Sequence, residues 1–128
     1  MHNKTYTVVI NKPLHETFLA SLNPKNTPKW IDSMVEEQAS EFPPKLGTTY
    51  RNRGEAGDWS EFSITEFEQD KVFTLSQKSG AYNVRYVFKP IADDQTELTY
   101  TEWETEGKLA NPLPEESIQK LKRLIEKQ

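Results

Sequence analysis

The sequence predicts an α+β domain in which a curved antiparallel β-sheet of about seven strands grips a C-terminal α-helix. Three observations favour this fold. From residue 47 onward, apolar and β-branched segments alternate with turn residues. Two short helices are expected between the first strand and the second, and a single apolar stripe runs along the C-terminal segment. Such a long meander tends to curl around the helix, because sheets twist and an exposed edge is costly.

The N-terminal part is expected to hold one strand and two helices. Residues 5–10 are rich in β-branched side chains, which favour a strand. Pro13 stands where a helix begins, and apolar residues recur at fourfold spacing over residues 14–22, so a helix over residues 13–22 is predicted. The Thr27–Pro28 pair repeats a cap followed by proline, which predicts a second short helix that carries Trp30.

The remainder is expected to be a meander closed by a helix. Residues 35–42 form a weak strand pattern, and turn residues then separate strand patterns at residues 47–53, 59–67, 72–78, 82–90 and 96–104. After Pro114, acidic side chains in the first turn and the apolar residues Ile118, Leu121 and Ile125 predict a helix. This helix is too short to be stable alone, so we expect it to lie against the sheet.

Composition limits the partners of the protein. A chain of 128 residues suffices for one domain over residues 1–128, and its formal net charge of -4 argues against a nucleic-acid partner. The chain has no cysteine and no apolar run that would serve as a signal peptide or support membrane insertion. We therefore expect a cytoplasmic protein, and the oligomeric state stays open.

The sequence offers no metal or cofactor motif. His2 and His15 are the only histidines, and without cysteine they cannot assemble a zinc site. The glycines are too dispersed for a phosphate-binding loop. We therefore expect no metal and no cofactor.

Several short stretches point to a known family, namely Asn11-Lys12-Pro13, Trp30, Leu46-Gly47-Thr48, Ile64-Thr65-Glu66-Phe67, Phe73-Thr74-Leu75 and Thr96-Glu97-Leu98-Thr99-Tyr100. In their order along the chain they resemble the START-like helix-grip superfamily (SRPBCC), which includes the polyketide cyclases and the birch-pollen allergen relatives. The resemblance implies a seven-stranded sheet around the C-terminal helix, with an apolar cavity between them. Members bind lipids, sterols, polyketides or plant hormones, and some catalyse cyclisation or dehydration or activate a heat-shock ATPase. A fold with so many uses does not fix one function.

The inward faces of the strands are expected to form the ligand site. Alternate residues of a strand share a face, and the aromatic face should point at the C-terminal helix. Buried tyrosine hydroxyls need partners, which a pocket with a few polar groups would supply; the alternative is that these side chains only fill the core. The predicted ligand-binding residues are Trp30, Tyr50, Phe62, Ile64, Phe73, Leu75, Tyr82, Val84, Tyr86, Phe88, Leu98, Tyr100, Trp103 and Leu121.

The segment after Tyr100 leaves two alternatives open. Regular alternation puts Glu102 in the cavity wall, where it is a candidate general acid or base. One extra residue near Thr101 would instead form a β-bulge that turns Trp103 inward and releases Glu102 to solvent. We favour the bulge, and hence binding over catalysis.

Three functions are therefore considered. The leading hypothesis is the binding of a small, mostly apolar ligand, such as a lipid, a polyketide-like molecule or an aromatic molecule, between the sheet and the C-terminal helix. The first alternative is a cyclase- or dehydratase-type enzyme that works by proton transfer without a metal. The second is a co-chaperone-like interaction module with a tightly filled interior and an exposed patch.

Overall fold

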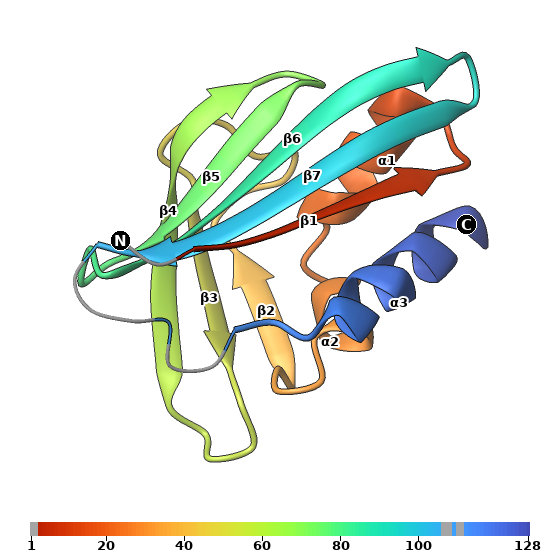
Figure 1. Cartoon of the computed structure of the whole chain (residues 1–128). Helices are drawn as coiled ribbons and strands as arrows, with labels where there is room; N and C mark the ends of the chain where they lie inside the picture. The colour runs from red at the N-terminus through yellow and green to blue at the C-terminus, as the bar shows by residue number, and fades with distance from the viewer. Residues whose placement is uncertain (1–2, 106–108, 110–111) are drawn as a thin grey trace.

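A curved antiparallel sheet with helices on one side makes up the fold (Figure 1). The computed structural model of the chain describes residues 3–105, 109 and 112–128. Within these residues the elements are β1 (Asn3–Ile10), α1 (Leu14–Leu22), α2 (Thr27–Trp30), β2 (Glu36–Ala39), β3 (Thr49–Arg53), β4 (Trp59–Glu68), β5 (Val72–Gln77), β6 (Tyr82–Ala92), β7 (Gln95–Glu104) and α3 (Glu115–Glu126). The predicted fold class is confirmed, with two short helices between the first two strands and one helix at the C-terminus.

The sheet has seven strands in the order β1-β7-β6-β5-β4-β3-β2. Strands β2 to β7 pair with their neighbours in sequence, whereas β1 pairs with β7 at the other edge. The sheet curls, so that β2, β3 and β4 run steeply across the direction of β1, β6 and β7 (Figure 1). A β-bulge between Ile64 and Glu66 interrupts the pairing of β4 with β5, and bulges bend and twist the strand that carries them.

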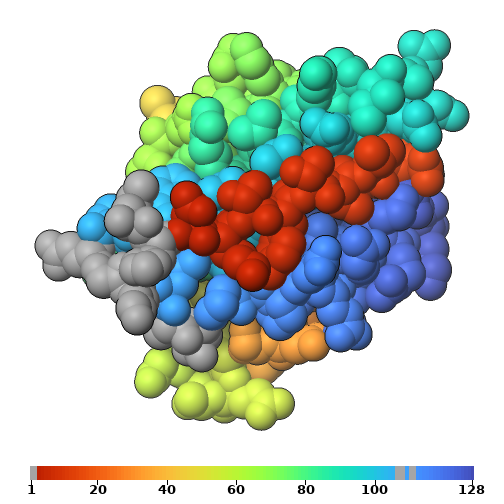
Figure 2. Space-filling model, in the orientation of Figure 1, coloured from red at the N-terminus to blue at the C-terminus, as the bar shows by residue number. Residues whose placement is uncertain are grey.

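The helix α3 lies beside β1 on one face of the molecule, as Figure 2 shows. Two hydrogen bonds fix this placement: the Asn11 backbone N–H donates to Glu126 at 2.8 Å, and the Lys122 ammonium donates to the Val9 carbonyl at 2.7 Å. The predicted apolar stripe of α3 is confirmed, because Ile118, Leu121 and Ile125 are buried. This stripe holds the short helix on the sheet.

The predicted helix starts differ from the observed ones in detail. The helix predicted over residues 13–22 begins at Leu14, and Pro13 is its N-cap. The predicted N-cap at Thr27 is wrong, because Asn26 precedes α2 and Thr27 is the first helical residue. The Thr27 hydroxyl donates to the side chain of Glu37 instead, at 2.5 Å. A long-range partner thus replaces the expected local one.

The core fills only one end of the space between the sheet and the helices. The Phe18 ring of α1 meets the rings of Phe67, Phe73 and Phe88 edge-on, at centroid distances of 5.7, 5.8 and 5.2 Å. Trp30 of α2 closes this packed region, with its ring 6.5 Å from that of Tyr86 and 6.5 Å from that of Tyr100. Beyond these two tyrosines the same faces of β6 and β7 continue, and the space there is open.

Candidate functional site

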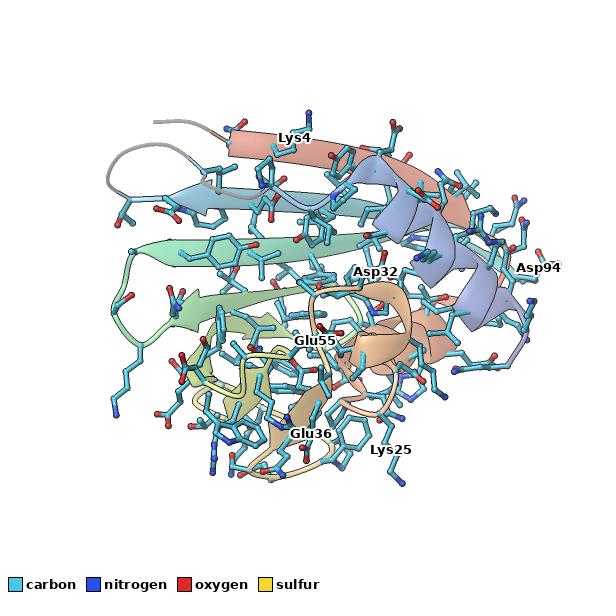
Figure 3. The ribbon with its side chains drawn as sticks, turned by 90° about the horizontal axis from the view of Figure 1, so that it is seen from below. Lys4, Lys25, Asp32, Glu36, Glu55 and Asp94 are labelled. Carbon is cyan, nitrogen blue, oxygen red and sulfur yellow. The ribbon has the colours of Figure 1, made fainter. Side chains whose placement is uncertain are left out.

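A cavity of about 590 Å³ occupies the open end of the concave side. Strands β2 to β7 supply one wall, and the end of α1, α2, the loop after it and residues 112–117 supply the other. In the view of Figure 3, Asp32 lies on this loop close to α3. The Lys120 ammonium of α3 donates to both Asp32 carboxylate oxygens, at 2.8 and 3.0 Å. This ion pair ties the exposed loop at the cavity mouth to α3.

Half of the predicted ligand-binding residues line this cavity. They share one property: each lies on the inward face of a strand at the open end of the sheet. They are Tyr50, Phe62, Leu75, Tyr82, Val84, Tyr86 and Tyr100.

Most of the other predicted residues lie in the packed core and do not line the cavity. Six of them are buried among helices and strands, namely Trp30, Ile64, Phe73, Phe88, Leu98 and Leu121. The pattern of the sequence marks the inward face correctly for the four strand residues among them, namely Ile64, Phe73, Phe88 and Leu98. It does not show which end of that face is filled.

Trp103 is the one predicted ligand-binding residue that lies outside both the core and the cavity lining. The pairing of β6 with β7 runs without a shift through Val84–Glu102 and Asn83–Trp103. The bulge that we favoured at this point is therefore wrong, and so is the inward placement of Trp103. The alternative of regular pairing is confirmed: Glu102 is 0% exposed and lines the cavity.

The Glu102 carboxylate receives three hydrogen bonds. Its Oε2 atom accepts from the Tyr82 hydroxyl and, at 3.1 Å, from the Tyr100 hydroxyl. Its Oε1 atom accepts from the Leu113 backbone N–H at 2.6 Å. The Leu113 carbonyl in turn accepts from the Tyr6 hydroxyl at 2.7 Å. Glu102 therefore links β6 and β7 to the segment that leads into α3.

The buried tyrosines of the cavity hold their protons strongly. Burial raises the pKa of Tyr82, and its hydrogen bond to Glu102 raises this pKa further. Burial is also the main cause of the raised pKa values of Tyr86 and Tyr100. All three hydroxyls are thus neutral hydrogen-bond donors near neutral pH.

A second glutamate, Glu37 of β2, faces the cavity from the other side. Its Oε1 atom accepts from the Thr27 hydroxyl at 2.5 Å, and its Oε2 atom accepts from the Asn52 amide at a long 3.5 Å. Burial raises the pKa of Glu37 from 4.5 to about 7, although these two hydrogen bonds lower it in part. Glu37 thus changes its charge near neutral pH.

The neighbouring Glu36 lies on the opposite face of β2, and its pKa shifts in the opposite direction to that of Glu37. Glu36 accepts hydrogen bonds from Gln38 at 2.9 Å and from Arg53 Nε at 3.0 Å. These bonds lower the pKa of Glu36. Adjacent residues of β2 therefore carry the same carboxyl group in two contrasting environments.

Sequence reasoning missed the polar side of the cavity, namely Thr27, Glu37 and Asn52. The only signal was the alternation in residues 49–53, where Tyr50 and Asn52 share one face. Pairing of Glu37 with Asn52 extends this face into β2. The strand pattern of residues 35–42 is too weak to establish that register without the structure.

His15 does not line this cavity. His15 Nδ1 lies 2.8 Å from Asp70 Oδ1, on the surface. His2 falls outside the described residues. In the part of the chain that the structure covers, no three acidic, histidine or cysteine side chains are grouped so that they could hold a metal ion. No helix in that part has the length and apolarity needed to cross a membrane.

Solved structures with the same architecture show the fold to be the START-like helix-grip fold. A conserved protein of unknown function from Enterococcus faecalis superposes with a TM-score of 0.75 at 13% identity, covering 97% of this chain and 71% of that one. The Aha1 dimer from Colwellia psychrerythraea gives 0.61 at 14% identity, covering 98% and 90%. The di-domain ARO/CYC protein BexL of the BE-7585A biosynthetic pathway gives 0.63 at 11% identity, covering 81% of this chain and 36% of that one. At these identities the likeness establishes the fold alone.

The sequence itself gives one match. No curated protein matches it. The family model described as a domain of unknown function, DUF3284, matches residues 33–115. This match spans β2 to the start of α3 and includes both Glu37 and Glu102. Because it covers more than half of the chain, the chain belongs to the DUF3284 family.

Proposed function

We propose that the protein binds a small, mostly apolar molecule in the cavity between the sheet and α3. The observation that carries this proposal is the cavity itself. Its volume of about 590 Å³ falls within the range of about 300–1,000 Å³ that is usual for small-molecule sites. Its wall combines aromatic and aliphatic side chains with a few polar groups, which is the usual composition of such sites.

The two alternative functions receive less support from the geometry. An interaction module with a tightly filled interior does not need a cavity of this size. Proton transfer by Glu102 is disfavoured because both of its oxygens already accept hydrogen bonds from the protein. The likenesses to the Aha1 dimer and to BexL concern the fold and do not favour either alternative.

Nile red, a neutral dye that fluoresces in apolar sites, tests the proposal. We expect it to bind the wild-type protein, and we expect Val84→Trp to abolish binding because the indole would fill the cavity. Val87→Trp is the matched control, since Val87 lies on the opposite face of β6. Leu75→Phe is a second, milder obstruction that should weaken dye binding. It serves as the test if Val84→Trp fails to fold.

Thermal melting followed by circular dichroism establishes that each variant is folded. The proposal fails if the wild-type protein does not bind the dye. It also fails if both folded obstructing variants bind the dye as tightly as Val87→Trp does.

A further inference from the structure

We infer that the cavity selects apolar amines, and that Glu37 holds their ammonium head group. This inference rests on the proposed function, because it names the chemical class of the molecule that the cavity takes. Its starting point is the charge of the wall. The ionisable side chains that line the cavity are Asp32, Glu37, Glu102 and tyrosines, and none of the described lining residues is Lys, Arg or His.

Two of the three carboxylates are already engaged with other groups. Asp32 pairs with Lys120 at the mouth. Glu102 accepts hydrogen bonds from two tyrosine hydroxyls and a backbone N–H. Of the three, only Glu37 has neither a cationic partner nor more than one hydrogen bond of ordinary length in the part of the chain that the structure describes.

Glu37 has acceptor capacity left for a ligand. A carboxylate offers about four acceptor positions. Thr27 occupies one of them at 2.5 Å, and Asn52 approaches another at only 3.5 Å. An ammonium group carries three N–H donors. Its charge-assisted hydrogen bonds to a carboxylate are stronger than those of a neutral hydroxyl or amide.

Tyr86 is a further polar side chain of the cavity wall. It is 4% exposed and lines the cavity, whereas the buried side-chain atom that lacks a hydrogen-bond partner within the described residues is Trp30 Nε1 of the packed core. Burial raises the pKa of Tyr86, and the charge of Glu37 raises this pKa further.

The same wall disfavours acidic ligands. A fatty-acid carboxylate in the cavity would lie among like charges and would have no basic side chain to pair with. Burial of an unpaired charge is unfavourable, and a nearby like charge makes it more so. The cavity should therefore distinguish molecules with the same apolar tail by the charge of their heads.

The charge of Glu37 predicts how amine binding depends on pH. The groups that face Glu37 are Thr27 from α2, Tyr50 and Asn52 from β3 and Tyr86 from β6, with Glu102 on the far wall. Near neutral pH, Glu37 is divided between its protonated and ionised forms, because burial raises its pKa to about 7. An amine stays cationic until pH about 10. Its affinity should therefore rise as the pH rises through about 7 and Glu37 ionises.

Displacement of bound Nile red by decylamine, decanol and decanoic acid tests the inference, because the three molecules share one tail. At pH about 8, decylamine should displace the dye at a concentration about tenfold or more below that of decanoic acid, with decanol between them. Glu37→Gln should weaken decylamine about tenfold and should strengthen decanoic acid. Glu36→Gln is the matched control and should leave the order unchanged, because that carboxyl group lies on the outer face of β2 beside Arg53.

A comparison at pH about 6 and about 8 needs no variant, and decylamine should bind more tightly at the higher pH. The inference is overturned if decanoic acid displaces the dye as well as decylamine does. It is also overturned if folded Glu37→Gln behaves like Glu36→Gln. In either case the wild-type protein would still bind the dye, so the proposed function would stand. A wild-type protein that binds no dye would overturn the proposed function and the choice of amines together.

Discussion

Two glutamates share the wall of one cavity, and their partners give them different roles. Glu102 is completely buried and receives three hydrogen bonds, one of which holds the segment before α3. Glu37 receives one short and one long hydrogen bond, and burial raises its pKa to about 7. The first is therefore a structural link, and the second is the group available to a ligand.

Replacement of Glu102 by glutamine tests the structural role. The amide can accept hydrogen bonds on one side only, so it would face at least one of the three donors with its own N–H groups. We expect Glu102→Gln to lower the free energy of unfolding by about 2–4 kcal/mol, measured by urea denaturation. Glu97→Gln, on the outer face of the same strand, should change it by less than about 0.5 kcal/mol. Equal effects of the two substitutions would contradict the role of Glu102.

The sequence predicts the inward direction of the Glu102 side chain better than that of the Glu37 side chain. Strict alternation after Leu98 and Tyr100 leads directly to an inward Glu102, and the error lay in expecting a bulge. Glu37 sits in a short edge strand whose local pattern is weak, and its inward direction depends on pairing with Asn52. Thr27 shows the same limit, because its partner is ten residues away and not in its own helix.

In strand β7, the pairing register decides which aromatic side chains face inward. Thr96, Leu98, Tyr100 and Glu102 alternate inward along its whole length, and Trp103 faces outward, opposite Asn3 and Asn83. The bulge that the structure does contain in β4 lies between Ile64 and Glu66, where no local pattern marks it. Strand positions are thus readable from the sequence, whereas bulges depend on the curvature of the whole sheet.

Two tryptophan substitutions test this register. Trp30 is 1% exposed and packs against Tyr86 and Tyr100, so Trp30→Ala should lower the free energy of unfolding by about 3–5 kcal/mol. Trp103 is half-buried on the outer face, so Trp103→Ala should cost less than about 1.5 kcal/mol. Urea denaturation of both variants measures the difference. A cost for Trp103→Ala that matched that of Trp30→Ala would show that the indole is inside.

At the scale of the whole molecule, the length of α3 explains where the cavity lies. The helix has 12 residues and contacts β1, α1 and α2. With α1 it covers the end of the sheet that Phe18, Phe73 and Phe88 fill. Within the described residues, the open end is covered by the end of α1, by α2 and the loop after it, and by residues 112–117. The sequence predicts the fold and the inward faces, but the filled and open ends follow from how far each helix reaches across the sheet.

Ligand binding between the sheet and α3 can be tested directly by a nuclear magnetic resonance titration of isotope-labelled protein with decanol, a neutral ligand that does not depend on the charge of Glu37. We expect intermolecular nuclear Overhauser effects from the decanol chain to the methyl groups of Leu75 and Val84, inside the cavity. The exposed methyl groups of Val9 and Ile91 should show none. Effects confined to those exposed methyl groups, or no effects at saturating decanol, would contradict ligand binding between the sheet and α3.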